Sequence, residues 1–524
     1  MNNWRIHFVF FFIIIAGLGI TARMFYIQII NSGYYSALAR GQSQDYSEVQ
    51  AQRGDIFLRD EFSGGSSSFL AATNKDYFSL YAVPKEIKDV ELVSARFGIS
   101  QEKLNNTDDP YEPLVNMLSE EDANKALELG IEGIYAKKEK IRYYPAKDLL
   151  SHVLGFVGYS GDQRVGQYGV EGFYNEALAG GKDLNLTIDY NIQFTLEEKL
   201  REKKDYLDAD GASAIVMDPK TGEIIALAVI DSFDLNNYSG VKNIDIFLND
   251  AVQKMFEPGS VFKPFTAAAA IDKGLISPST KYIDKGAIKI GKYTIRNSDE
   301  KSHGEQSMTN VLELSLNTGA IFMEQTLGHD QFREYVKRFG FGERSGVDLQ
   351  GEVFGDVRNI TDTSRDINFA TASFGQGIAV TPIQLVVAFS AFANAGKMVN
   401  PHVNKDLETE IIGEPISPKT AALVTNMLVS AVENGYGKKA KVLGYKVAGK
   451  SGTAQVPNEE KGGYLEDKTV HSFIGFAPAY DPRFIALVKL DNPKGINFSS
   501  DSIAPLFSEI AEYILNYYEI PPGD

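Results

Sequence analysis

Two residues with complementary chemistry, Ser260 and Lys263, lie three positions apart in this chain. A serine hydroxyl is a weak nucleophile until a base takes its proton, and residues three apart on a helix share one face. The spacing therefore predicts a nucleophile, Ser260, with its own base, Lys263. Such a pair is common by chance as a surface serine near a solvated lysine, so the prediction needs support from other motifs.

Two further motifs follow in order, Ser315-Leu316-Asn317 and Lys450-Ser451-Gly452-Thr453. Alone, the first is an ordinary polar pair and the second is typical of a solvated turn. Behind a Ser-x-x-Lys pair, they match the order found in serine acyl-transfer enzymes that act on penicillin and D-Ala-D-Ala peptides. The order of the three motifs is far more specific than any one of them.

Over most of its length the chain resembles a class B penicillin-binding protein, a membrane-anchored peptidoglycan D,D-transpeptidase. Further matches are Gln52-Arg53-Gly54-Asp55-Ile56 with Arg59-Asp60, Arg142-Tyr143-Tyr144-Pro145, Tyr168-Gly169-Val170-Glu171-Gly172, Leu186-Thr187-Ile188-Asp189 with Gln193, Phe374-Gly375-Gln376-Gly377-Ile378 and Thr381-Pro382-Ile383-Gln384-Leu385. Two positions depart from the family pattern: Ser451 stands where many members have threonine, and Leu58 where aspartate is usual.

The resemblance implies a role for each motif. Ser260 would attack the carbonyl of the penultimate D-Ala and expel the terminal D-Ala, and an amine of a second stem peptide would resolve the acyl-enzyme. An ordinary lysine has a pKa near 10.4, so burial and the charge of Lys450 must lower the pKa of Lys263. Ser315 would relay a proton to the leaving amine, and Asn317 would hold the substrate's peptide amide.

The Lys450-Ser451-Gly452-Thr453 motif is interpreted as an edge strand against which an extended peptide lies. Gly452 would let the substrate backbone come close, while Lys450 and the hydroxyls of Ser451 and Thr453 would receive the terminal carboxylate. The backbone N–H groups of Ser260 and Thr453 are the expected oxyanion hole.

Several elements must position these residues. Residues 212–217 and 223–229 predict a hairpin, and residues 445–456, 473–476 and 484–488 predict further strands. A helix is expected from Ser260 to Gly274, with Pro264 removing one backbone hydrogen bond, and a turn or loop is expected at Ser315 and Asn317. Upstream, residues 89–97 and 119–129 predict amphipathic helices. The fold class is thus mixed α/β (α+β), with helices on an antiparallel sheet, as in the penicillin-recognising transpeptidase fold.

The N-terminus predicts a membrane anchor. Between Arg5 and Arg23, residues 6–22 contain only two clearly polar side chains, His7 and Thr21, and 17 residues are the lower limit for a transmembrane helix. A cleaved signal peptide is the alternative, but apolar residues continue past Arg23. We predict a short cytoplasmic tail and anchor over residues 1–39, a pedestal (dimerisation-type) domain over 40–183 and a transpeptidase domain over 184–524. The resemblance implies a single-pass protein of the bacterial cell membrane with an extracytoplasmic body.

Composition excludes other classes of protein. The 524 residues exceed what one core usually supports, so several domains are expected. A net charge of -17 argues against nucleic acid as a partner. The chain has no cysteine and six scattered histidines, so we expect neither a metal site nor a cofactor.

The predicted function is transpeptidation of D-Ala-D-Ala stem peptides, with β-lactams as covalent inhibitors. A septal role is weakly preferred over elongation. The alternatives are a D,D-carboxypeptidase or β-lactamase, a β-lactam receptor, and a catalytically silent scaffold of the wall-synthesis complex. Because no glycosyltransferase motif precedes residue 184, we expect a polytopic glycan polymerase and other wall-synthesis proteins as partners.

Overall fold

The computed structural model describes residues 4–25, 52–61, 67–108, 111–160, 163–362, 365–458 and 462–523. The chain divides into two compact units. The smaller unit contains described residues up to 54 together with 73–143 and 179–182, and the larger unit contains 55–72, 144–178 and those from 183 onward. The boundaries at 39/40 and 183/184 stay predictions, and the first lies outside the described residues.

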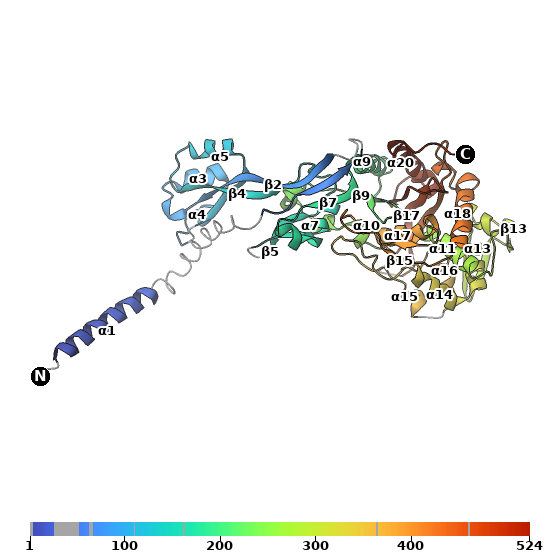
Figure 1. Cartoon of the computed structure of the whole chain (residues 1–524), viewed down its shortest axis with the longest axis horizontal. Coiled ribbons are helices and arrows are strands. Elements are labelled where there is room, and N and C mark those ends of the chain that lie inside the picture. Colours follow the sequence, from blue (N-terminus) through green and yellow to red (C-terminus); the bar gives the residue numbers. More distant parts are fainter. Residues whose placement is uncertain are drawn as a thin grey trace. The chain divides into compact units, whose positions relative to one another are not determined.

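The smaller unit is a twisted antiparallel sheet with short helices. From Thr73 onward, β2 (Ser67–Ala82) pairs with β3 (Glu112–Leu118) and β4 (Ile134–Tyr143). Helices α3 (Val90–Phe97), α4 (Gln101–Leu104) and α5 (Glu120–Leu127) accompany it, and Leu80, Val93 and Leu104 share its core (Figure 1). The two helices predicted in this region are confirmed. Each begins where a side chain accepts a hydrogen bond from the first turn, Asp89 for α3 and Ser119 for α5.

The two arginine-containing motifs of this unit contact each other. A guanidinium nitrogen of buried Arg142 donates to the carbonyl of Gly54 at 2.8 Å, and the Asn74 amide donates to the carbonyl of Arg53 at 2.5 Å. The first hydrogen bond joins the two motifs directly, and the second joins the earlier motif to β2 at Asn74, the residue that pairs with Arg142.

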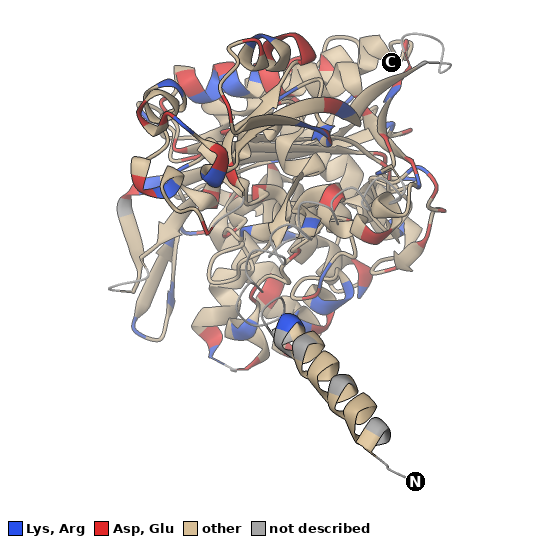
Figure 2. Cartoon of the chain, turned by 90° about the vertical axis from the view of Figure 1, so that its left-hand side faces the viewer, with Lys and Arg blue, Asp and Glu red and all other residues tan. Residues whose placement is uncertain are grey.

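Helix α1 (Trp4–Phe25) contains the predicted apolar segment. Figure 2 marks few charged residues along its described length, and Arg23 lies in its last turn. Within the described part of the chain, no helix has both the length and the apolar character needed to cross a membrane. The predicted continuation of the helix beyond residue 25 lies outside the described residues.

The larger unit is built on a five-stranded antiparallel sheet in the order β16-β17-β18-β8-β9. The strands are β8 (Gly211–Met217), β9 (Ile224–Ile230), β16 (Ala448–Pro457), β17 (Tyr464–Ala477) and β18 (Phe484–Asp491). Alternate side chains enter different cores: Ala214 and Val216 pack with helices α9 (Tyr190–Tyr206) and α20 (Ala504–Tyr517), whereas Ile215 and Met217 face the opposite side. The predicted hairpin and the antiparallel sheet with helices are confirmed (Figure 1).

Other elements surround this sheet. In the same unit, β1 (Ile56–Asp60) pairs with the start of β2 and, in parallel, with β7 (Leu184–Asp189). Paired strands are β5 (Phe156–Ser160) with β6 (Gln163–Gln167), β10 (Lys281–Asp284) with β13 (Gly304–Ser307), β11 (Ala287–Ile290) with β12 (Tyr293–Arg296) and β14 (Met398–Val399) with β15 (Ile411–Gly413). The other helices are α6 (Ser151–Leu154), α7 (Gly169–Phe173), α8 (Asn175–Ala179), α10 (Asp250–Gln253), α12 (Met308–Glu313), α13 (Asn317–Leu327), α14 (His329–Arg338), α15 (Arg358–Thr361), α16 (Asp366–Ala372), α17 (Pro382–Ala393), α18 (Pro418–Glu433) and α19 (Ser499–Ser502), with 3-10 turns η3 (Pro84–Glu86), η4 (Leu235–Gly240), η5 (Ile244–Phe247) and η7 (Lys438–Ala440).

The helix expected to begin at Ser260 has two parts. A 3-10 turn, η6 (Gly259–Phe262), carries Ser260, and the α-helix α11 (Lys263–Asp272) starts only at Lys263. Pro264 therefore falls in the first turn of α11, where an N–H group has no partner within the helix in any case. The expected loss of a hydrogen bond at Pro264 is wrong for this reason.

Candidate active site

Ser260 lies on a turn that is hydrogen-bonded to the glycine-rich segment containing Gly375. The Gly259 N–H donates to the carbonyl of Gly375 at 2.9 Å. A side chain at Gly375 would place its Cβ only 2.2 Å from the carbonyl oxygen of Gly259, so this close approach requires glycine. Ser260 is partly exposed, and within the described residues its hydroxyl has no hydrogen-bond partner. The hydroxyl is thus presented on a fixed turn and is free to react.

Three of the predicted residues meet at one hydroxyl. Lys263 Nζ donates to Ser315 Oγ at 3.2 Å and to the Ser315 carbonyl at 2.5 Å. From the opposite side, Lys450 Nζ donates to the same Ser315 Oγ at 3.1 Å and to the carbonyl of Ser451 at 3.0 Å. Ser315 has a φ of 55° and lies in the predicted turn, between α12 and α13. Asn317, expected in the same turn, is instead the first residue of α13.

Burial shifts the pKa of both amines. Lys263 is 0% exposed and Lys450 is 2% exposed. Burial, followed by the positive charge of Lys450, holds the pKa of Lys263 well below its ordinary value. Burial alone lowers the pKa of Lys450 to about 7. Both shifts weaken the protonated form of the amine, which suits Lys263 to take a proton.

The third motif lies on β16, the edge strand of the sheet, as predicted. Gly452 packs against the protein itself: a Cβ there would lie 2.8 Å from Ser472 Oγ and 2.9 Å from the Pro258 carbonyl oxygen. A Cβ at Gly259 would in turn lie 3.3 Å from the Thr453 carbonyl oxygen. The nucleophile's turn and the edge strand are thus in close contact, which alone accounts for the glycine at 452.

Two side chains expected to hold substrate are bonded within the protein. The Thr453 hydroxyl donates to Ser499 Oγ and accepts from the Ser499 N–H, both at 3.0 Å. The Asn317 amide donates to the carbonyl of Arg296 at 2.9 Å. Each keeps spare capacity, because a hydroxyl oxygen has a second lone pair and an amide has a carbonyl oxygen and another N–H. Ser451, 8% exposed, lies on the Thr453 face of the strand. The substrate contacts of these three residues stay predictions.

Glu257, three residues before Ser260, was not singled out in the sequence. It is 9% exposed, accepts the Gly377 N–H at 2.9 Å and accepts the Tyr464 hydroxyl at 3.0 Å. Burial raises its pKa to about 7, although both hydrogen bonds act in the opposite direction. Glutamate before Pro-Gly is typical of an exposed turn, so only the folded structure reveals this buried carboxylate.

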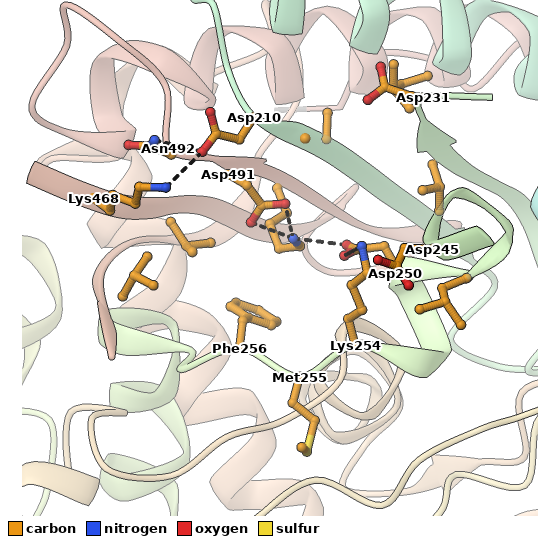
Figure 3. Close-up of a pocket in the computed structure, with 18 of the residues that line it drawn as sticks. Asp210, Asp231, Asp245, Asp250, Lys254, Met255, Phe256, Lys468, Asp491 and Asn492 are labelled. Carbon is orange, nitrogen blue, oxygen red and sulfur yellow. Dashed lines mark hydrogen bonds and ion pairs between the residues drawn. The ribbon is translucent and has the colours of Figure 1, made fainter. Parts of the chain in front are cut away.

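A pocket of about 440 Å³ lies in the larger unit, and Glu257 is among the residues that line it. Figure 3 shows Phe256 and Met255 across its hollow from Asp250 and Asp491. Its wall also includes Gln455, Val456 and Pro457, at the end of the strand that carries the Lys450 motif.

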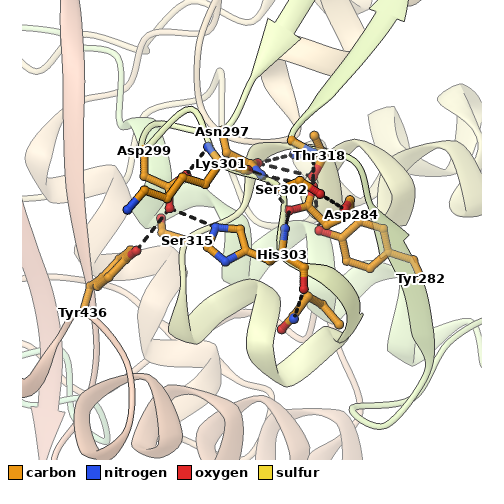
Figure 4. Close-up of polar contacts among 12 residues, drawn as sticks. Tyr282, Asp284, Asn297, Asp299, Lys301, Ser302, His303, Ser315, Thr318 and Tyr436 are labelled. Carbon is orange, nitrogen blue, oxygen red and sulfur yellow. Dashed lines mark hydrogen bonds and ion pairs between the residues drawn. The ribbon is translucent and has the colours of Figure 1, made fainter.

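A separate polar network supports the turn at Ser315 and the helix start at Asn317 (Figure 4). Asp284, 1% exposed, accepts from the Thr318 hydroxyl at 2.8 Å and from the Asn297 amide at 3.0 and 3.1 Å. Asn297 Oδ1 accepts the Thr318 N–H at 3.2 Å, which joins the loop after β12 to the start of α13. Nothing in the motif spacing indicated this network, because its members come from separate segments.

Comparison with known proteins agrees with this geometry. Residues 212–512 match the penicillin binding protein transpeptidase domain, and residues 48–189 match the penicillin-binding protein dimerisation domain. Stage V sporulation protein D of Bacillus subtilis is 32% identical, over 97% of this chain and 84% of its own length. The probable peptidoglycan D,D-transpeptidase PenA of Neisseria meningitidis is 29% identical, over 99% of this chain and 94% of its own length.

A solved structure shares both the fold and part of the sequence. Penicillin binding protein 3 of Mycobacterium tuberculosis, complexed with aztreonam, superposes with a TM-score of 0.72 at 28% identity, over 91% of this chain and 98% of that chain. The matched domain covers more than half of the chain and contains all three motifs. The chain therefore belongs to the penicillin-binding protein transpeptidase family.

Proposed function

We propose that this chain is a peptidoglycan D,D-transpeptidase that crosslinks stem peptides through an acyl-enzyme on Ser260, and that β-lactams inhibit it by acylating the same serine. The observation that carries the proposal is the meeting of two buried amines at Ser315 Oγ, one of them from Lys263, which directly follows the turn that carries Ser260. The names of the relatives and the aztreonam complex of the similar structure support it.

Acylation follows from the charges of the site. Neutral Lys263 takes the Ser260 proton while Oγ bonds to the carbonyl carbon of the penultimate D-Ala. The N–H groups of Ser260 and Thr453 stabilise the oxyanion. Ser315 then gives its proton to the departing D-Ala nitrogen as the C–N bond breaks, and it regains one from the amines bonded to it. The product is an ester on Ser260 and free D-Ala.

The second half-reaction decides the class of enzyme. An amine forms the new C–N bond as the ester C–O bond breaks and Ser260 recovers a proton. Water in place of the amine would give a carboxypeptidase or, with a β-lactam, a β-lactamase. The family match and the transpeptidase names of the relatives favour the amine.

The cellular setting belongs to the proposal too. We assign the chain to the bacterial cell membrane, anchored by its N-terminal helix with the catalytic part outside, because the described apolar side chains of α1 are exposed. We also assign it a septal role, with elongation as the alternative, and a polytopic glycan polymerase as partner. Fractionation and a fluorescent fusion test these assignments: recovery in the soluble fraction contradicts the anchor, and lateral rather than mid-cell signal contradicts the septal role.

Labelled penicillin tests the chemistry. We expect a covalent adduct on the peptide containing Ser260, stable for many minutes, and none in Ser260→Ala. Rapid turnover of the drug without a lasting adduct would indicate a β-lactamase. The absence of any adduct would indicate a silent scaffold.

A further inference from the structure

The pocket of Figure 3 has an excess of negative charge. Its lining includes the carboxylates Asp210, Asp231, Asp245, Asp250, Glu257 and Asp491, but only the cations Lys254, Lys468 and Lys489. These cations are already engaged: Lys489 bonds Asp250 at 3.0 Å and Asp491 at 2.6 Å, while Lys468 lies 3.5 Å from Asp210. Lys204 and Lys494, which are not among the lining residues, also pair with Asp231 at 3.0 Å and with Asp210 at 3.9 Å. Among the described residues this leaves Asp245 and Glu257 as the lining carboxylates without a Lys or Arg within 4 Å, and an uncompensated carboxylate attracts a positively charged ligand.

Two buried carboxylates of the pocket differ in one respect. Asp250, 7% exposed, has Lys489 as its counter-charge, and despite its burial the pKa of Asp250 is lowered. Glu257 is similarly buried, yet its described partners are the Gly377 N–H and the neutral Tyr464 hydroxyl. Because a buried carboxylate normally has a cation beside it, Glu257 lacks the partner that its neighbour has.

Two lining residues of the pocket are close in sequence to the predicted catalytic motifs. Glu257 precedes Ser260 by three residues, which limits their Cα–Cα distance to about 11 Å. On the other wall, Gln455 follows Thr453 by two residues, about 7 Å along the strand. On β16 the lining residues lie beyond Thr453, toward the end of the strand away from Lys450. Lys450 is the residue expected to bind the carboxylate of the donor peptide.

The shape and the lining suit an alkyl ammonium group. The volume of about 440 Å³ falls within the range of ligand pockets, and Phe256, Val456 and Val470 offer apolar surface to methylene groups. A metal ion is not favoured, because among the described residues no three His, Asp or Glu side chains are placed to hold one.

We propose that this pocket receives the ammonium group of the acceptor stem peptide and that Glu257 is the carboxylate that pairs with it. The inference rests on the proposed transpeptidase function and assigns the acceptor subsite within it. After binding, the ammonium releases one proton to water, the amine forms the C–N bond, and the second N–H proton passes to Ser260 Oγ as the ester C–O bond breaks.

The test distinguishes recognition of the acceptor's positive charge from a change in how easily any acceptor reaches the acyl-enzyme. A thioester of an N-acylated D-alanine supplies the acyl group, and aminolysis is measured against hydrolysis. Nα-acetyl-L-lysine amide is the charged acceptor, and hydroxylamine is an acceptor that is uncharged at pH 8. In Glu257→Gln the half-saturating concentration of the lysine amide should rise at least about tenfold, since an ion-pair hydrogen bond is lost. The effect with hydroxylamine should be much smaller.

Two matched variants complete the experiment. Glu257→Asp keeps the charge and should retain a preference for the lysine amide over hydroxylamine. Glu324→Gln neutralises another buried carboxylate, 1% exposed and also with a pKa raised to about 7, but one that does not line the pocket. It should behave as the unmodified protein does.

The outcomes are distinguishable. Equal losses with both acceptors in Glu257→Gln, or no loss with either, overturn the inference while leaving the transpeptidase function intact. Failure of the unmodified protein to form an acyl-enzyme with the thioester or with penicillin overturns the proposed function itself.

Discussion

Buried lysines occur in two contrasting settings within the larger unit. Lys263 and Lys450 contact a hydroxyl and backbone carbonyls, and burial lowers the pKa of each. Lys489, 3% exposed, is equally buried, but Asp250 and Asp491 outweigh its burial and raise its pKa above the ordinary value. Burial alone therefore does not decide charge. The presence of a carboxylate separates a lysine that holds the fold together from one that can take up a proton.

The largest effect should follow from removing the unpaired base. Lys263→Met should slow acylation by labelled penicillin about 10²–10⁴-fold, because a positioned base contributes about that much. The same change should leave the free energy of unfolding unchanged or raise it, because no buried partner charge is abandoned. Stopped-flow acylation and urea unfolding measure the two quantities. A strong loss of stability would mean that Lys263 is a structural lysine after all.

The paired lysine should give the reverse result. Lys489→Met leaves Asp250 buried without its main counter-charge and should cost about 3–5 kcal/mol of unfolding free energy. Adding Asp250→Asn should recover much of that loss, because the uncompensated charge is then gone. Urea denaturation of the single and double variants measures the difference. If the double variant were as unstable as the single one, packing rather than charge would explain Lys489.

Sequence patterns predict part of the site and of the fold, but not all of either. Ser260, Lys263, Ser315 and Lys450 could be placed in one site because short motifs occur in a known order. The sheet could be predicted because strands such as Gly211–Met217 are apolar runs bounded by turn residues. Each of these signals comes from residues close together in the sequence, so it can be recognised without knowledge of the fold.

The missed features all depend on long-range contacts. Glu257 looks like part of an exposed turn, and Tyr464, which bonds it, is 207 residues away. The hydrogen bond between the Thr453 hydroxyl and Ser499, on the separate helix α19, was not predicted, while the substrate contact of Thr453 stays a prediction. The helix starts at Lys263 rather than Ser260, and the turn before it is bonded through Gly259 to Gly375 across 116 positions, a contact that no local pattern reports.

The pH dependence of stability should distinguish the two kinds of lysine. The folded pKa of Lys450, about 7, is below its unfolded value, so between these values the unfolded chain binds more protons. Stability should therefore rise with pH in that window, by up to about 1.4 kcal/mol per pH unit for such a group.

Comparing the unmodified protein with Lys450→Met at pH 7, 8 and 9 isolates this contribution. The variant should gain less stability as the pH rises. Lys489→Met should not change the slope in this window, because the raised pKa keeps Lys489 charged in both states. Identical slopes in the unmodified protein and Lys450→Met would show that Lys450 is charged in the folded protein. Lys450 would then not belong with Lys263 as a lysine whose pKa is lowered by burial.

Asp284 provides a smaller test, since it is a buried charge stabilised by hydrogen bonds alone. Its burial raises the pKa, but donors from Gly286, Thr318, His303 and Asn297 outweigh this, and the net shift is downward. Thr318→Val removes one donor and should cost only about 1 kcal/mol, because the remaining donors still satisfy the carboxylate. Acylation should slow only modestly, through the looser start of α13 that carries Asn317. Urea unfolding and penicillin acylation measure both effects. A loss as large as that of Lys489→Met would show that hydrogen bonds cannot replace a counter-charge at Asp284. Ion pairs alone would then stabilise the buried charges of this protein.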